Sequence, residues 1–311
     1  MDNPISEDKV QLGRRLFYDS RLSGNGSYSC SSCHQQARAF TDGRAQAVGS
    51  TGATHPRSAL SLTNVAYNLS FGWADQLRRT LEAQMEVPMY NEHPVELGLK
   101  DRDLEVLARF GREDVERFRA AFPGEEPAVS MPHIVKAIAS FERVLLSGNS
   151  PFDRYLYRDD RSGMSPQALR GSQLFFSDRL RCSECHGSFN LSGPVRYEGG
   201  PIVPAVFHNT GVLSADLGLF AQTKTAGDVG RFRTPTLRNI AVTAPYMHDG
   251  SIATLPDVIR HYSSGGRPGP FKSDQIRGFE ISPAEVDDLV AFLGSLTDDE
   301  FLSNPAFGNP R

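Results

Sequence analysis

Apolar residues recur at helical spacing in several separate segments of this chain. Between residues 133 and 146, Ile134, Ile138, Phe141 and Leu145 fall on one face of a helix, because positions three and four apart come together at 3.6 residues per turn. Few stretches alternate apolar and polar residues as half-buried strands do. The pattern therefore predicts an all-α fold built from short helices.

Capping signals mark the expected ends of three further helices. Ser165 followed by Pro166 is typical of a helix start, and Ser6 can cap a similar helix near the N-terminus. Residues 282–285, Ser-Pro-Ala-Glu, form a capping box that opens a last helix. Gly294 is expected to end that helix, since glycine commonly follows the last helical turn.

The chain contains a long-period internal repeat. Residues 13–22, Gly-Arg-Arg-Leu-Phe-Tyr-Asp-Ser-Arg-Leu, resemble residues 171–180, Gly-Ser-Gln-Leu-Phe-Phe-Ser-Asp-Arg-Leu. Because there are two copies and no more, the repeat predicts a duplicated domain and not a solenoid.

The linker over residues 147–163 is the natural boundary between the two copies. We expect an N-terminal domain over 1–155 and a C-terminal domain over 156–311. Connections rich in Gly, Pro, Ser and Asn run over 48–75 and 187–235. Loops of this length in a compact domain are typical of segments that wrap a cofactor or form a site.

Composition and charge exclude several classes of partner. The chain is 39% hydrophobic and 23% charged, which suffices for two apolar cores. A net charge of -4 gives no electrostatic case for nucleic acid. Without a run of about eighteen apolar residues, no membrane span is expected. The opening Met1-Asp2-Asn3-Pro4 lacks the features of a signal peptide, so we expect a mature form whose leader was removed.

All four cysteines belong to two Cys-x-x-Cys-His segments, formed by Cys30, Cys33 and His34 and by Cys182, Cys185 and His186. Two thiols at this spacing can bond both vinyl groups of one haem c, and the histidine that follows becomes the proximal iron ligand. A zinc site built from both cysteine pairs is the alternative, but it leaves the two histidines without a role. The segments therefore predict two covalently attached haems, one ligated by His34 and one by His186.

The ligand on the other face of each iron decides what each haem does. An open face permits chemistry, whereas a filled face favours electron transfer. Spacing alone does not choose among the remaining histidines and methionines, which are His55, His93, His133, His208, His248 and His261, and Met1, Met85, Met89, Met131, Met164 and Met247.

Motifs spread over nearly the whole chain resemble those of the bacterial di-haem cytochrome c peroxidase superfamily. They include Phe-Thr-Asp-Gly at 40–43, Ala-Ser-Phe-Glu-Arg at 139–143, Thr-Pro-Thr-Leu-Arg-Asn at 234–239 and Pro-Tyr-Met-His-Asp-Gly at 245–250. Within the superfamily, residues 71–75 and 87–97 are most similar to MauG-like enzymes of the MbnH type, which modify a tryptophan in a partner protein.

The resemblance implies roles for three residues near the first haem. Glu96 matches the distal acid/base glutamate and Gln84 the distal glutamine beside it. A carboxylate can move a proton from the near to the far oxygen of peroxide, and an amide can hold the oxygen in place. Trp73, the single tryptophan, matches the residue between the haems and implies an electron relay. Without the motifs, all three would be read as ordinary surface or core residues.

The resemblance also implies that the two haems are unequal. Tyr262, fourteen residues after His248, matches the distal ligand of the second haem, which is methionine in ordinary di-haem peroxidases and tyrosine in MauG. The adjacent His261 is the rival ligand. Ser50 replaces the distal histidine of peroxidases that rest inactive, which predicts an open first haem. His55 is out of register and is expected to support a ligand or contact a propionate.

Two further matches concern an ion and an exit route for electrons. A calcium ion between the haems is implied, bound by the carbonyl groups of Thr243 and Pro245, with Ser58 at the position of the family's asparagine. Leu180 stands where MauG has a surface tryptophan that draws electrons from its partner. Long-range oxidation is therefore expected to leave by another route.

These features predict a periplasmic di-haem oxidoreductase. It uses hydrogen peroxide to form a bis-Fe(IV)-type state and oxidises a periplasmic partner protein at a tryptophan. One alternative is an ordinary cytochrome c peroxidase that takes electrons from a small cytochrome or cupredoxin, which requires a high-potential second haem. The other is an electron carrier, which requires two six-coordinate irons.

Overall fold

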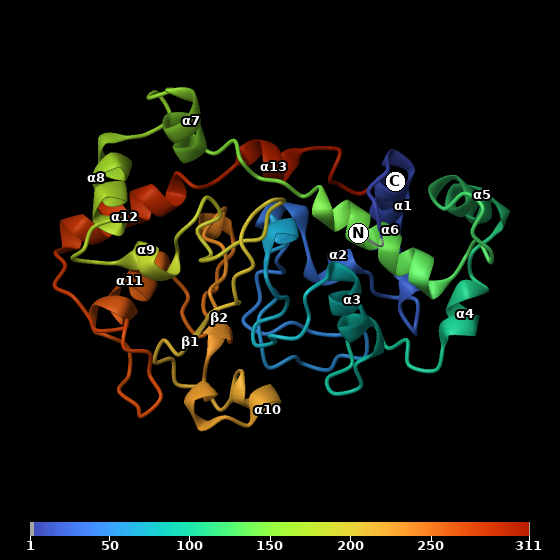
Figure 1. The fold of residues 1–311 in the computed structure, drawn as a ribbon, viewed down its shortest axis with the longest axis horizontal. Helices are drawn as coiled ribbons and strands as arrows, with labels where there is room; N and C mark the ends of the chain where they lie inside the picture. Colours follow the sequence, from blue (N-terminus) through green and yellow to red (C-terminus); the bar gives the residue numbers. More distant parts are fainter. Residues whose placement is uncertain (1–2, 311) are drawn as a thin grey trace.

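The computed structural model describes residues 3–310. Met1, one of the candidate iron ligands, lies outside the described residues. Two mainly helical halves lie side by side along the long axis, and both chain ends lie on the first half (Figure 1). Within the described residues, the one sheet pairs β1 (Phe207–His208) antiparallel with β2 (Phe232–Arg233). The fold is therefore helical, with this short ribbon as a departure from the all-α prediction.

The helices are short and separated by long connections. None within residues 3–310 is both long and apolar enough to cross a membrane. The α-helices are α1 Glu7–Phe17, α2 Cys30–Cys33, α3 Leu81–Tyr90, α4 Asp103–Leu107, α5 Arg112–Ala121, α6 Met131–Arg143, α7 Pro151–Arg158, α8 Pro166–Phe175, α9 Cys182–Cys185, α10 Phe220–Thr223, α11 Leu255–Ser263, α12 Pro283–Gly294 and α13 Asp299–Ser303. The 3₁₀ turns are η1 Ser20–Leu22, η2 Gln36–Arg38, η3 Val65–Tyr67, η4 Ala226–Asp228 and η5 Ile240–Val242.

The three predicted N-caps are confirmed. The hydroxyl groups of Ser6, Ser165 and Ser282 each accept a hydrogen bond from the backbone N–H three residues later. The predicted end is confirmed to within one residue, because α12 ends at Gly294 itself and Ser295 is its C-cap. That helix is not the last one, however, since α13 follows it.

Helix α6 lies close to the position predicted from its apolar residues. It begins two residues earlier than expected, after the N-cap Ser130, and ends at Arg143. Ile134, Ile138 and Phe141 are fully buried against the first core. The apolar spacing predicted the buried face of the helix. Its ends are set by the N-cap Ser130 and by Val144, which leaves the helical conformation.

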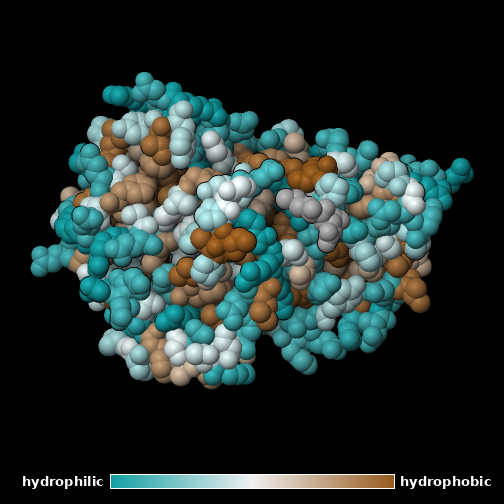
Figure 2. Space-filling model, viewed as in Figure 1, coloured by the Kyte–Doolittle hydropathy of each residue, from teal (hydrophilic) through white to brown (hydrophobic). Residues whose placement is uncertain are grey.

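Each half has its own apolar core, and in the view of Figure 2 hydrophilic residues dominate the periphery while hydrophobic residues gather near the middle. Two segments cross the predicted boundary between the domains. Phe152 of α7, inside the predicted linker, packs into the second core. Phe301 of α13 packs into the first core, which places the C-terminal segment over the N-terminal half. The division at residue 155 stays a prediction. Phe152 and Phe301 each pack into the core of the half on the other side of it.

The opening glycine of each repeat serves the same helix contact in both halves. Helix α1 packs on α6, and α8 packs on α12. A Cβ atom on Gly13 would lie 1.9 Å from the Ala137 carbonyl oxygen, and one on Gly171 would lie 1.9 Å from that of Asp288. Each glycine is therefore required for the close approach of two helix backbones.

A second repeated element lies at the seam between the halves, outside the repeat of residues 13–22 and 171–180. Leu-Thr-Asn-Val-Ala-Tyr at 62–67 and Leu-Arg-Asn-Ile-Ala-Val at 237–242 each place an asparagine in the left-handed conformation before a 3₁₀ turn. The side-chain amide of Asn64 donates to the Ser147 carbonyl at 2.9 Å, and that of Asn239 donates to the Ser147 hydroxyl at 3.1 Å. These buried bonds hold the two halves together through one residue of the linker.

Candidate active site

Two cavities, one in each half, contain the two Cys-x-x-Cys-His segments. His34 and its two cysteines line the first cavity, and His186 with its two cysteines lines the second. The cavities are similar in size, with empty volumes of about 1400 and 1450 Å³. Because the cysteine pairs lie in different cavities, they do not form one four-thiolate zinc site. In the part of the chain that the structure describes, no cluster of His, Cys, Asp and Glu could hold a metal ion by itself.

Both motif histidines have the tautomer that a metal ligand needs. Nδ1 of His34 lies 2.8 Å from the Phe40 carbonyl oxygen, and Nδ1 of His186 lies 3.0 Å from that of Leu191. Since a carbonyl group can only accept, Nδ1 carries the proton and leaves the Nε2 lone pair available to a metal. Burial lowers the pKa of His34 and lowers that of His186 to about 4. Both rings are therefore neutral, as iron ligation requires.

The four cysteines are partly buried, and their thiols are uncharged. Burial raises the pKa of Cys33 to about 11 and that of Cys182 to about 12, and it also raises the pKa of Cys30 and Cys185. A thiolate metal site would need ionised cysteines. Neutral thioether bonds to haem fit these surroundings better.

Polar groups without a hydrogen-bond partner line both cavities and show whether the cavities suit haem. Among the described residues, Gln84 Oε1 and His248 Nε2 are buried without a hydrogen-bond partner, and they line the first and second cavity respectively. Leaving such an atom unpaired costs about 1–3 kcal/mol. Arg233 lines both cavities, and burial lowers its pKa to about 10. A buried cation needs anionic partners, which haem propionates would supply, so these residues fit one haem in each cavity.

Glu96 lines the first cavity from the loop that follows α3. The Ser50 N–H donates to the Glu96 carbonyl at 2.7 Å, and the Leu97 N–H donates to the Pro88 carbonyl at 2.8 Å, which fixes the loop. Burial raises the pKa of the Glu96 carboxyl to about 7. A group that titrates near neutral pH can both take and return a proton, which is what general acid/base catalysis requires.

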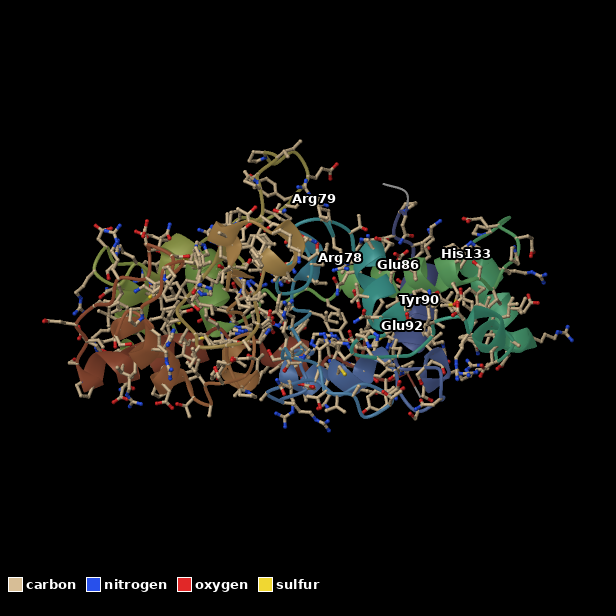
Figure 3. The ribbon with its side chains drawn as sticks, turned by 90° about the horizontal axis from the view of Figure 1, so that it is seen from below. Arg78, Arg79, Glu86, Tyr90, Glu92 and His133 are labelled. Atoms are coloured by element: carbon tan, nitrogen blue, oxygen red, sulfur yellow. The ribbon has the colours of Figure 1, made fainter. Side chains whose placement is uncertain are left out.

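Helix α3 presents Gln84 to the same cavity. Thr80 caps the helix, and Gln84 lies one turn further on. Figure 3 shows Arg78 close to the seam between the halves, with Glu86 and Tyr90 further along on α3 and Glu92 beyond its end. The segment from 78 to 96 therefore leads from the seam into the first half and carries both predicted peroxide-handling residues.

Trp73 lies at the seam and lines both cavities. Its indole N–H donates to the Ser58 carbonyl at 2.8 Å, and its ring meets the His248 ring edge-on with centroids 6.5 Å apart. His248 in turn stacks on Phe232 at 3.7 Å. The Arg233 N–H donates to the Trp73 carbonyl at 2.7 Å, so segments of both halves fix the indole.

The structure separates the two candidate ligands of the second iron. Tyr262 is on α11 and lines the second cavity, where burial raises the pKa of its phenol. His261 directs Nε2 toward the Thr210 carbonyl at 2.8 Å, so this nitrogen is a hydrogen-bond donor. His208 and Met247 also line the second cavity, although spacing alone did not single them out.

Ser50, His55 and Leu180, which the family resemblance also singled out, lie in different surroundings. Ser50 has its backbone bonded to the Glu96 loop and carries no group that ligates iron. His55 lines the first cavity, with Nε2 3.9 Å from Glu96 Oε1. Leu180 is buried and lines the second cavity. The sequence did not indicate the closeness of His55 and Glu96, because they are 41 positions apart in the chain.

The residues of the predicted calcium site are engaged in protein contacts. The Ser58 hydroxyl donates to the Met247 carbonyl at 3.2 Å, and the Thr243 hydroxyl donates to the Ile240 carbonyl at 3.1 Å. Ala244 and Pro245 are joined by a cis peptide bond. These contacts bring Ser58 beside the segment that contains Pro245.

Comparison with known proteins places the chain in a family. A family model described as di-haem cytochrome c peroxidase matches residues 7–161, and a cytochrome c model matches residues 168–297. The cytochrome-c peroxidase IdrP1 of Denitromonas iodatirespirans is 36% identical, over 97% of this chain and 84% of that protein. The chain belongs to the di-haem cytochrome c peroxidase family. Like its relatives, this di-haem peroxidase is a haem-dependent oxidoreductase with two c-type haems.

Two further relatives are MauG or MauG-like proteins. The methylamine utilization protein MauG of Methylorubrum extorquens is 35% identical, over 94% of this chain and 79% of that protein. The crystal structure of a MauG-like protein associated with microbial copper homeostasis superposes with a TM-score of 0.95 at 42% identity. That match covers 99% of this di-haem peroxidase and 95% of the other chain.

Proposed function

We propose that this di-haem peroxidase uses hydrogen peroxide to oxidise a periplasmic partner protein at a tryptophan side chain. The observation that carries the proposal is Trp73, which lines both haem cavities and so can couple them. When bound, the haems supply two irons that can each hold one oxidising equivalent. Two electrons and two protons then reduce one peroxide to two waters, and the electrons come from the partner. The similarity to MauG and to a MauG-like structure supports this branch.

Glu96 and Gln84 are proposed to manage the peroxide. Ionised Glu96 takes the proton from the near oxygen and returns it to the far oxygen, which leaves as water. Gln84 has an unpartnered oxygen in the same cavity and an amide N–H₂ that can donate to an oxygen atom. Ser50 cannot block the site as a distal histidine would. These residues support an open first haem.

Tyr262 is proposed as the distal ligand of the second iron. A buried phenol keeps its proton, so ionisation needs a cation beside it, which ferric iron supplies. A phenolate is a hard anionic ligand that favours the oxidised metal. Such a ligand argues against the high-potential second haem that an ordinary cytochrome c peroxidase requires.

A Trp73→Phe variant tests the coupling of the two cavities. In the wild type, one equivalent of peroxide should bleach both ferric haem signals together in a stopped-flow measurement. In the variant, the first haem should still react, but the second should lag behind it because the indole bridge is lost. Tyr67→Phe, a change elsewhere at the seam, is the control and should behave as wild type.

The outcome for the wild type also separates the alternatives. If only the first haem responded in the wild type, shared oxidation would be wrong and an ordinary peroxidase would be favoured. The partner is tested by mass spectrometry of candidate periplasmic proteins, including any small secreted protein whose gene lies beside this one. Treatment with wild-type enzyme and peroxide should change the mass of one tryptophan residue, and treatment with the Trp73→Phe variant should change it less.

A Tyr262→Phe variant tests the second iron ligand. Loss of the phenolate should convert the resting low-spin signal of the second haem to a high-spin ferric signal in electron paramagnetic resonance. The neighbouring His261→Gln variant should leave the low-spin signal in place, since Nε2 of His261 is bonded to a carbonyl group. The opposite pattern in these two variants would assign the ligand to His261.

Three finer features are proposed with the function. Covalent haem attachment in bacteria takes place outside the cytoplasm, which supports a periplasmic enzyme. The matching contacts of Gly13 and Gly171, and of Asn64 and Asn239, support an internal duplication. Calcium stays a prediction, since the Ser58 hydroxyl already donates to a carbonyl group.

A further inference from the structure

His55 is attached to the segment that carries Glu96 through several backbone contacts. The loop that contains His55 closes on itself, since the His55 N–H donates to the Ala47 carbonyl at 2.7 Å. The Ser50 N–H of this loop donates to the Glu96 carbonyl at 2.7 Å. A Cβ atom on Gly49 would lie 1.8 Å from the Val95 carbonyl oxygen, so the two backbones are in close contact. The positions of His55 and Glu96 are therefore fixed relative to each other.

The hydrogen bonds of His55 define which ring nitrogen carries the proton. Nδ1 accepts the backbone N–H of Arg57 at 3.1 Å, and a backbone N–H can only donate. The neutral ring must therefore carry its proton on Nε2. That nitrogen lies 3.9 Å from Glu96 Oε1, at the edge of the first cavity.

We propose that His55 is a positioning residue for Glu96, because its Nε2–H faces the carboxylate from a loop bonded to the Glu96 backbone. The distance would shorten by about 1 Å to form a hydrogen bond, as catalytic hydrogen bonds often do when substrate binds. The donor holds Oε1 and leaves Oε2 to face the peroxide. It also favours the ionised carboxylate, which is the form that takes a proton from peroxide. This inference rests on the proposed role of Glu96.

The charged groups around this pair do not supply the same effect. Asp75, Arg78, Glu142 and Arg233 also line the first cavity, but burial alone accounts for the raised pKa of Glu96, so none of them stabilises its ionised form. Arg57, next to the His55 ring, is already paired with Asp216 through bonds of 2.6 and 2.9 Å. Cys30 and Cys33 face Glu96 across the cavity, and as haem thioethers they do not titrate. His55 is thus the group placed to stabilise ionised Glu96, and it acts through a neutral N–H.

The test is the pH profile of the reaction with hydrogen peroxide, measured by stopped flow on the di-haem protein. His55→Leu removes the donor, and His55→Asn is too short to reach Glu96. Both should raise the pH midpoint of the rate by about one unit, so that the rate at pH 6 falls about tenfold. His55→Gln keeps an N–H donor of similar reach, so its pH midpoint should return most of the way to the wild-type value. His93→Gln, an exposed histidine three residues before Glu96, should match the wild type.

The possible outcomes distinguish this inference from the proposed function. The resting haem spectrum of each variant reports whether the site is intact, and any variant that folds gives a profile. An unchanged midpoint in both His55→Leu and His55→Asn would overturn the role of His55 if Glu96→Gln is still strongly impaired. A lower rate with an unshifted midpoint would indicate a merely structural role. If Glu96→Gln reacted as fast as wild type, the proposed role of Glu96 would be what fails.

Discussion

Glu96→Gln should slow the reaction of the diferric enzyme with hydrogen peroxide by about 10²–10⁴-fold, the range expected for loss of a general acid/base. Glutamine preserves the size of the side chain but cannot accept the peroxide proton. Because burial raises the pKa of Glu96 to about 7, and because the ionised form is the base, the wild-type rate should rise with pH through about 7. Stopped-flow absorbance between pH 5 and 9 measures both effects.

The variant should lose this rise as well as the rate. Glu92→Gln is the matched control, since Glu92 is exposed just beyond α3 (Figure 3). It should keep both the wild-type rate and the wild-type pH profile. If the rate of the Glu96→Gln enzyme still rose with pH through about 7, another group would be the base.

Arg238→Met should lower the free energy of unfolding by about 3–5 kcal/mol, the cost of leaving one member of a buried ion pair without its partner. Arg238 and Asp153 are both almost fully buried and form two bonds, of 2.7 and 2.9 Å. Asp153 is on α7 in the linker, so this pair attaches the linker to the second half. Urea or thermal unfolding of the di-haem protein, followed by circular dichroism, measures the loss.

The ion pair also gives stability a dependence on pH. Burial by itself would raise the pKa of Asp153, but the hydrogen bonds and charge of Arg238 outweigh it and hold that pKa below its usual range. The stabilisation is thus present above the ordinary pKa of an aspartate and is lost as pH falls through the lowered value. The variant should show a weaker acid dependence than the wild type.

Two comparisons test whether the lost charge is the cause. Arg260→Met breaks an exposed ion pair with Asp257 and should leave the unfolding midpoint almost unchanged. Replacing both Asp153 and Arg238 by apolar residues should recover much of the loss, since no unpaired charge then remains buried. If the double variant were as unstable as Arg238→Met, the hydrogen bonds of Arg238 to other groups would be the larger contribution.

Local signals in the sequence predicted much of the helical framework. A serine hydroxyl that accepts a backbone N–H acts within one turn, so Ser6, Ser165 and Ser282 could be recognised without tertiary context. The end of α12 at Gly294 was a local signal of the same kind, since glycine commonly marks the end of a helix. The linker was predicted only as the boundary between the two copies, and helix α7 in it was not predicted, because Phe152 is stabilised by a core that local sequence does not show.

The sequence by itself determined that this protein has two haem-attachment segments, since in each Cys-x-x-Cys-His segment two thiols and the histidine that follows serve one cofactor within a few residues. The motifs of a di-haem peroxidase further nominated Glu96, Gln84, Trp73 and Tyr262. Only the tertiary structure brought His55 beside Glu96 and turned His261 toward a carbonyl group. Those decisions depend on the orientation of backbone groups far apart in the chain, which no pattern of residue types records.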